Sequence, residues 1–192
     1  ECPDGSLRRL HQEDFCQATG RRSWQKYQVR GGPAYGEIAT VVRRHCTDPL
    51  RDMETVAQWA VFNVLVGNND AHAKNLSLLY TSAGVRLAPL YDVVSTLVYP
   101  QIDREFSIEL GGQRTAEGLH RVALVKFARS LGMKEPAITR LGRPLVERVR
   151  GEIEAVLHRV AGEHGHNPVL DEIHAVVLAR AEHVDAWLRG PK

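Results

Sequence analysis

The residues best suited to chemistry lie in a short polar segment that follows an apolar one. Asp70 is followed by Asn75 five positions later, and Asp92 comes 17 residues after Asn75. Carboxylate and amide oxygens are hard ligands that suit Mg²⁺, and a carboxylate can also accept the proton of an attacking hydroxyl. A base beside two metal-binding groups is the arrangement that metal-assisted phosphoryl transfer requires.

The same spacing occurs in the catalytic loop of protein kinases, where the Asp of D-x-x-x-x-N is the base and the Asn binds Mg²⁺. Each piece also has a plainer interpretation. Asn68–Asp70 are residue types favoured in turns, and Asp92 could cap a following helix. The combination of a helix, a polar loop, a hairpin and a returning Asp favours the catalytic interpretation. Ordinary protein kinases have His-Arg in place of Asn68-Asn69 and Asp-Phe-Gly in place of Tyr91–Val93.

Several stretches of the sequence resemble the HipA-type toxin kinases, the serine/threonine kinases of bacterial toxin–antitoxin pairs. The resemblance runs from about Arg9 through the last predicted helix and is sharpest in residues 9–20 and 63–92. The stretches that carry it are Arg9–Gln17, Lys26-Tyr27 leading to Gly31–Pro33, Val66–Ser77 and Leu87–Asp92.

This resemblance implies a Mg-ATP-dependent kinase that phosphorylates a protein serine or threonine. Asp70 is then the general base, and Asn75 and Asp92 hold Mg²⁺. The residues implied to lie against ATP are His72, Lys74, Asn75, Tyr91 and Asp92. The His72 imidazole either touches a phosphate or braces the loop. The resemblance further implies a translation factor such as an aminoacyl-tRNA synthetase as substrate and a DNA-binding antitoxin as partner.

Two other classes of function stay open. One is a non-catalytic C-terminal lobe that binds an antitoxin or a separately encoded N-terminal lobe. The other is a metal-dependent hydrolase that uses Asp70, His72 and Asp92, although Lys74 and the Asp-to-Asn spacing argue against it.

A kinase also needs a loop that covers the phosphates and a lysine that pairs with them, and neither is evident in the sequence. Gly31–Gly36 is rich in glycine but continues with Glu37-Ile38, where a Walker motif has Lys and Ser or Thr. In the resembled family these parts precede the stretch that begins near His11. We therefore expect residues 1–192 to be a C-terminal kinase domain without its ATP-covering lobe, which binds Mg-ATP weakly and transfers phosphate poorly.

The elements that position these residues are predicted to be mainly helical with a small β-hairpin, as in a protein-kinase-like C-terminal lobe. Apolar residues recur at helical spacing from Met53 to Leu65, and Gly67 is placed to stop this helix. Strands are expected at Leu76–Tyr80, Val85–Ala88 and Phe106–Leu110. Residues 1–36 show no regular pattern.

The remaining sequence predicts three helices with apolar stripes that face a core. The last of them should be capped by Asn167, with Pro168 at its first position. The stripes run through Leu124–Leu131, Leu145–Val160 and Leu170–Leu188.

Composition and charge exclude several classes of protein. Of the 192 residues 43% are hydrophobic and 25% are charged, which is typical of a globular chain, and the formal net charge of +2 gives no drive toward direct nucleic-acid binding by bulk charge. The longest apolar stretch, Trp59–Val66, is too short to span a membrane. Three widely spaced cysteines argue against a disulfide framework or a structural zinc, so a reducing cytoplasm is the expected location. These cysteines are Cys2, Cys16 and Cys46.

Other candidate groups are expected to be structural. His164 and His166 are predicted to lie in a solvated loop between helices, with no third metal ligand nearby. His45-Cys46 resembles a nucleophilic pair only through adjacency. For the neighbouring carboxylates Glu13 and Asp14, we expect one to cap or hydrogen-bond and the other to face solvent.

Overall fold

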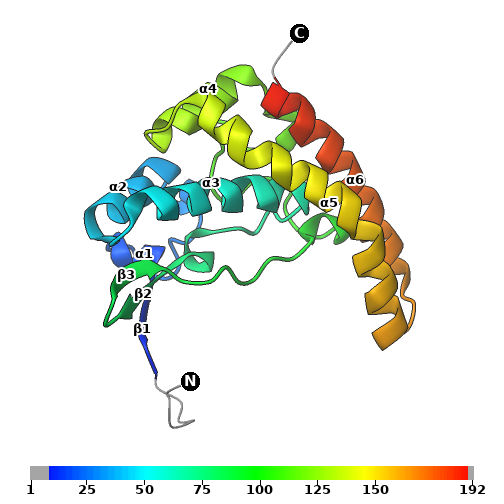
Figure 1. The fold of residues 1–192 in the computed structure, drawn as a ribbon, viewed down its shortest axis with the longest axis horizontal. Helices are drawn as coiled ribbons and strands as arrows, with labels where there is room; N and C mark the ends of the chain where they lie inside the picture. The colour runs from blue at the N-terminus through cyan, green and yellow to red at the C-terminus, as the bar shows by residue number, and fades with distance from the viewer. Residues whose placement is uncertain (1–8, 190–192) are drawn as a thin grey trace.

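The computed structural model describes residues 9–189, which form a small antiparallel sheet joined to a body of helices (Figure 1). The strands and the helices of more than one turn are β1 (His11–Asp14), α2 (Tyr35–His45), α3 (Pro49–Leu65), β2 (Ser77–Thr81), β3 (Gly84–Leu87), α4 (Arg121–Ser130), α5 (Glu135–His164) and α6 (Pro168–Arg189). The single turns are α1 (Phe15–Ala18) and four 3₁₀ turns at Gln28–Arg30, Ala73–Asn75, Thr96–Val98 and Ala116–Gly118. The predicted fold class, mainly helical with a little β structure, is confirmed.

The sheet has three strands in the order β1-β2-β3, one more than the predicted hairpin. β1 pairs with β2 from His11 opposite Tyr80 to Asp14 opposite Ser77. The expectation that residues 1–36 lack regular structure is wrong for residues 9–36, which contain β1, α1, a 3₁₀ turn and the start of α2, while residues 1–8 lie outside the described residues. β1 is four polar or half-exposed residues with no alternating pattern, so only its pairing with β2 defines it as a strand.

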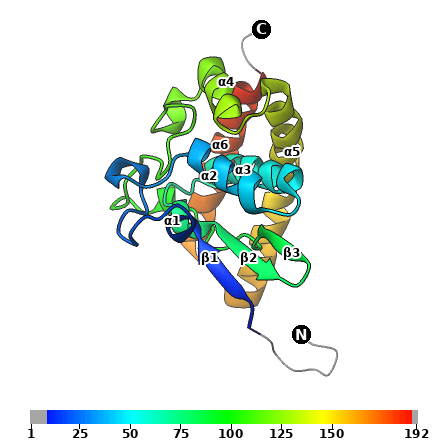
Figure 2. The same cartoon turned by 90° about the vertical axis from the view of Figure 1, so that its left-hand side faces the viewer.

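Helix α3 runs through the middle of the helical body, with α2 on one side and α5 and α6 on the other (Figures 1 and 2). It begins at Pro49, four residues before the predicted start, because the Asp48 side chain accepts a hydrogen bond from the Arg51 N–H at 3.2 Å. Its Trp59 lies 6.3 Å from the Tyr35 ring, centre to centre. The core is therefore built around the helix that leads into the polar loop.

The C-terminal helices α5 and α6 pack side by side along one flank of the molecule (Figure 1). α5 starts at Glu135, ten residues before the predicted Leu145, and continues through Pro144. Because proline usually ends or kinks a helix, the part of α5 before Pro144 was not predicted from the sequence. The predicted cap of α6 is confirmed, because Asn167 Oδ1 accepts the Val169 N–H at 3.0 Å.

The strand predicted at Phe106–Leu110 is wrong. These residues form a loop in which Leu110 makes a single bridge to Gln113. Ile108 and Leu110 are buried, which produced the alternating pattern, but the Ser107 N–H donates to the Asn69 carbonyl at 3.0 Å instead of to a neighbouring strand. Residues 106–110 are thus a partly buried loop that is hydrogen-bonded to the polar segment at Asn69.

Cys16 and Cys46 are buried and free, and Cys2 lies outside the described residues. Within residues 9–189 no helix combines the length and the apolar character that crossing a bilayer requires.

Candidate active site

The polar loop starts at a turn that only glycine fits. Gly67 follows the end of α3 with a φ of +69°, and a Cβ there would lie 2.7 Å from Val176 Cγ1 and 3.1 Å from Leu97 Cδ1. Such a φ and such close neighbours exclude other residues without strain. The chain can therefore leave α3 and turn directly into residues 68–75.

Three buried asparagines brace this loop from below. Asn63 Nδ2 donates to the Trp59 carbonyl at 2.8 Å, and Asn68 Nδ2 donates to Asn63 Oδ1 at 2.7 Å. Asn69 Nδ2 donates to the Arg104 carbonyl at 2.6 Å. Because each buried amide has a partner, the cost of desolvating these groups is offset and the loop has one defined path.

Asp70 projects from the braced loop into a half-exposed position. Its side chain is 44% exposed, and Oδ1 accepts a hydrogen bond from the Tyr27 hydroxyl at 2.8 Å. Oδ2 lies 3.9 Å from Nε2 of His72. The carboxylate is thus held on one oxygen and accessible to a ligand.

Asn75 and Asp92, which are 17 residues apart in sequence, are brought together. Asn75 Nδ2 donates to Asp92 Oδ2 at 2.6 Å, and Asn75 Oδ1 accepts the His72 N–H at 2.8 Å. Asp92 has a φ of +57°, the single positive φ of a non-glycine residue among residues 9–189. A strained backbone of this kind is frequent at functional sites.

Asp92 does not cap a helix. The chain from Pro89 to Ser95 has no helical turn, and the short turn that follows, Thr96–Val98, has Ser95 at its N-cap position. The plainer interpretation of Asp92 therefore has no support in the structure.

The His72 side chain is buried against Lys26. It is 7% exposed, and Nε2 lies 2.7 Å from the Lys26 ammonium nitrogen. Burial, followed by the charge of Lys26, lowers the pKa of His72 below its usual value. Since a lysine ammonium can only donate, Nε2 is the acceptor and the ring is neutral.

Tyr91 contacts the main chain of Lys74 and not its ammonium group. The Tyr91 hydroxyl donates to the Lys74 carbonyl and lies 2.7 Å from Ser77 Oγ. Tyr91 is one of the exposed large apolar residues, with 37% of its surface exposed. No hydrogen bond or ion pair of the Lys74 ammonium occurs within the described part of the chain.

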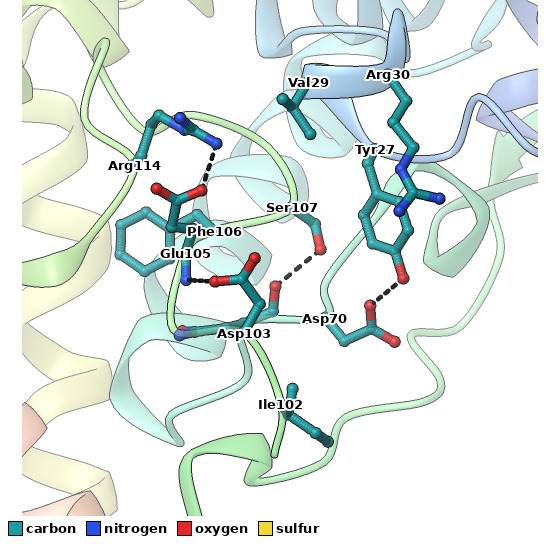
Figure 3. A pocket seen from close by; sticks show the side chains of 11 residues that line it. Tyr27, Val29, Arg30, Asp70, Ile102, Asp103, Glu105, Phe106, Ser107 and Arg114 are labelled. Atoms are coloured by element: carbon teal, nitrogen blue, oxygen red, sulfur yellow. Dashed lines mark hydrogen bonds and ion pairs between the residues drawn. The ribbon is translucent and has the colours of Figure 1, made fainter. Parts of the chain in front are cut away.

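A cavity of about 230 Å³ opens directly beside Asp70 (Figure 3). The Tyr27 and Arg30 side chains stand on one side of it, and Glu105 and Arg114, which form an ion pair, stand on the other. The full lining is Tyr27, Val29, Arg30, Asn69, Asp70, Ile102, Asp103, Glu105, Phe106, Ser107 and Arg114. Asn75 and Asp92 do not line it.

Lys26 and Tyr27 have no predicted role in the sequence analysis, and Arg30 and Arg114 are not among the predicted site residues. Tyr27 is 43 positions before Asp70, and Lys26 is 46 positions before His72. The polar residues that precede the Gly31–Pro33 turn could have been selected as candidates, but their spacing does not indicate which loop they contact.

The other candidate groups are structural. Burial, with Asp52 nearby, raises the pKa of Cys46 to about 12, so its thiol is not a nucleophile near neutral pH. Glu13 accepts the Tyr80 hydroxyl at 2.7 Å, while Asp14 caps α1. His166 lies 3.4 Å from Asp171 on the surface, and residues 9–189 contain no group of three His, Cys, Asp or Glu that could hold a metal ion.

Comparison with known proteins identifies the family of the chain and supports its fold. Residues 3–157 match the family described as the HipA-like C-terminal domain. A Sinorhizobium fredii protein named a putative kinase is 36% identical over 154 residues, which are 80% of this chain and 37% of that protein. The serine/threonine-protein kinase toxin HipA of Shewanella oneidensis is 29% identical over 136 residues, 65% of this chain and 31% of that protein.

A solved structure shares the fold. A chain of the Shewanella oneidensis complex of HipA, HipB and operator DNA superposes with a TM-score of 0.75 at 23% identity, and the match covers 98% of this chain and 46% of that one. The fold is therefore that of a kinase-like C-terminal lobe. The chain belongs to the HipA-like C-terminal domain family and spans less than half the length of each of these relatives.

Proposed function

We propose that this chain forms the catalytic-loop part of a Mg-ATP-dependent serine/threonine protein kinase. The observation that carries the proposal is that Asp70 lines an open cavity while Asn75 and Asp92, the two predicted metal ligands, contact each other. The relatives named as kinases support the same class of activity.

In this proposal Asp70 orients the acceptor hydroxyl and takes its proton. A bond forms between the hydroxyl oxygen and the γ-phosphorus of ATP, the bond from that phosphorus to the bridging oxygen breaks, and the electron pair leaves with ADP. Tyr27 holds one carboxylate oxygen of Asp70, which leaves the other free for the hydroxyl. Positioning of this kind is the main contribution of a protein to phosphoryl transfer.

Asn75 and Asp92 fit a Mg²⁺ ion. Asp92 Oδ1 has no protein partner among residues 9–189, and Asn75 Oδ1 has a second lone pair beyond the one that meets the His72 N–H. One carboxylate and one amide oxygen are enough, because Mg²⁺ commonly keeps waters and takes its other ligands from substrate phosphates. The ion would supply neutralisation of phosphate charge.

The residues implied to lie against ATP have unequal support. Lys74 offers a free ammonium for a phosphate, and Tyr91 offers an exposed ring next to Asp92. His72 is buried and occupied by Lys26, so we assign it to bracing the loop. A hydrolase built on Asp70, His72 and Asp92 is disfavoured, because the Lys26 ammonium contacts Nε2 of His72 and the other ring nitrogen, Nδ1, is buried.

The cavity beside Asp70 is the proposed site of the protein serine or threonine. An exposed Val29 and Ile102 at its rim, with Arg30 nearby, give it both apolar and charged surface for a peptide. A DNA-binding antitoxin is the proposed partner, because one relative is named a toxin and a structural neighbour was solved with HipB and DNA. The buried free thiols of Cys16 and Cys46 support a cytoplasmic location.

The test is incorporation of labelled phosphate from Mg-ATP into a protein acceptor. Three samples are compared: this chain, the full-length gene product that contains it, and that gene product with Asp70→Asn. We expect label only in the full-length wild type. The absence of label from the full-length wild type, with Mg-ATP bound, would contradict the kinase proposal and favour a binding module.

A further inference from the structure

The catalytic loop is contacted on two sides by one dipeptide from a distant part of the chain. Tyr27 reaches Asp70, and Lys26 reaches His72, which lies two residues after Asp70. The two side chains also contact each other, with the Lys26 ammonium 4.8 Å from the centre of the Tyr27 ring. A positive charge is thus placed close to the proposed base by residues outside the D-x-x-x-x-N loop.

The backbone of this dipeptide is fixed on both sides. The Ala73 N–H donates to the Lys26 carbonyl at 3.2 Å, and the N–H groups of Arg30 and Gly32 both donate to the Tyr27 carbonyl at 2.9 Å. A Cβ on Gly32 would lie 2.5 Å from the Gln25 carbonyl oxygen, so the close turn requires glycine at this position. Lys26 is therefore preorganised, and little entropy is lost when it binds a ligand.

The ammonium of Lys26 keeps donors to spare. One N–H is directed at His72 Nε2, and no carboxylate within residues 9–189 forms an ion pair with it. The side chain is half-buried, which strengthens its field relative to that of a fully solvated lysine. A charge held without an anionic partner, next to a base, fits an anionic ligand better than a purely structural role.

We propose that Lys26 is a phosphoryl-binding residue, which donates to the non-bridging oxygens of the γ-phosphate while Tyr27 holds the base. The inference rests on the proposed kinase function and extends it. During transfer these oxygens carry charge as the new oxygen–phosphorus bond forms and the bond to ADP breaks, and the proton of the hydroxyl goes to Asp70. A cation fixed beforehand at this point stabilises the transition state without reorganisation.

The experiment compares nucleotide affinities, which a purely structural role would not separate. Dissociation constants of Mg-ADP and of the Mg complex of a non-hydrolysable imido analogue of ATP are measured by calorimetry on the full-length gene product. The variants are Lys26→Met, the conservative Lys26→Arg, and Lys134→Met as a matched control, since Lys134 is an exposed lysine at the start of α5. The melting temperature of each variant verifies that it folds.

We expect Lys26→Met to raise the dissociation constant of the imido analogue about tenfold and that of Mg-ADP by less than about twofold. Loss of one charge-assisted hydrogen bond to the γ-phosphate predicts this difference. Lys26→Arg should restore most of the difference, and Lys134→Met should change neither constant. Equal changes for both nucleotides, or none, would overturn the inference about Lys26 even if Asp70→Asn abolishes transfer. If the wild type neither binds the analogue nor incorporates label, the kinase proposal and this inference fail together.

Discussion

The Asn75 side chain donates a hydrogen bond of 2.6 Å to the carboxylate of Asp92, and the two residues flank the hairpin formed by β2 and β3. The two residues are joined by β2 and β3, so the hairpin that separates them in sequence is what returns Asp92 to the loop. The positive φ of Asp92 completes this return. The pair therefore depends on the fold and not on proximity in the chain.

Removing the charge of Asp92 should impair phosphate transfer without unfolding the protein. In Asp92→Asn the amide keeps the shape but not the charge that a divalent cation requires, so we expect kcat of the full-length gene product to fall by about 100-fold or more. The measurement is the rate of label incorporation across a Mg²⁺ titration. Asp171→Asn is the control, because the Asp171 side chain is 75% exposed and lies far along the chain at α6. Equal rates in the wild type and in Asp92→Asn would contradict the metal assignment.

Gly67 should be needed for stability as well as for the path of the loop. Because its φ is +69° and Val176 and Leu97 crowd the position, Gly67→Ala should lower the free energy of unfolding by about 1–3 kcal/mol. Urea unfolding of the chain measures this. Gly151→Ala in the exposed middle of α5 has open space around it, so the same substitution there should raise the free energy by about 0.5–1 kcal/mol. Similar effects at both positions would show that the turn at Gly67 is not under the constraint described.

The Tyr27–Asp70 hydrogen bond should be visible in the titration of the phenol. Burial, and then the hydrogen bond to Asp70, raise the pKa of Tyr27 above its ordinary value of 10.0. A phenol with a raised pKa stabilises the fold below pH 10 and loses this contribution as the pH rises through the folded pKa. In Asp70→Asn the anionic acceptor is gone, so the midpoint should move down toward 10.

This shift is measured by carbon NMR of labelled tyrosine, with Tyr27→Phe to assign the signal. Tyr80 is an internal control, because its hydroxyl donates to Glu13 instead of Asp70 and its midpoint should not move. A Tyr27 midpoint that is the same in the wild type and in Asp70→Asn would mean that the hydrogen bond does not form in solution.

The two buried thiols should be inert in the native protein. Burial raises the pKa of Cys16 and raises that of Cys46 to about 12, so neither holds an appreciable thiolate fraction at pH 8. In a Cys2→Ser variant, iodoacetamide at pH 8 should label neither thiol until denaturant unfolds the chain. Mass spectrometry of the intact protein counts the adducts. Rapid labelling under native conditions would show that one of the two sites opens easily.

The parts of the fold with strong local patterns were predictable. The apolar periodicity of α3, the hairpin β2-β3 and the Asn167 cap all reflect interactions between residues close in sequence. β1 and the start of α5 were missed for the opposite reason. A four-residue polar strand exists only through its pairing with β2, and Pro144 lies inside a helix that tertiary packing preserves.

The same distinction applies to the site. Asp70, Asn75 and Asp92 could be selected because the loop spacing and the hairpin between them are local features, and the structure does bring Asn75 and Asp92 into contact. Lys26 and Tyr27 could not be given a role, since their contacts with the loop span 46 and 43 residues of chain. The cavity beside Asp70 is likewise built from three distant segments, which no periodicity connects.

The most direct test of the catalytic role of Asp70 is a single-turnover measurement with labelled Mg-ATP and a protein acceptor. The full-length wild type is compared with Asp70→Asn, and Mg-ATP affinity is measured on both by calorimetry. We predict that Asp70→Asn slows transfer by about 100-fold or more while the affinity changes by less than about threefold, because a general base acts on the hydroxyl and not on the bound nucleotide. Transfer by Asp70→Asn at the wild-type rate would contradict the assignment of Asp70 as the base.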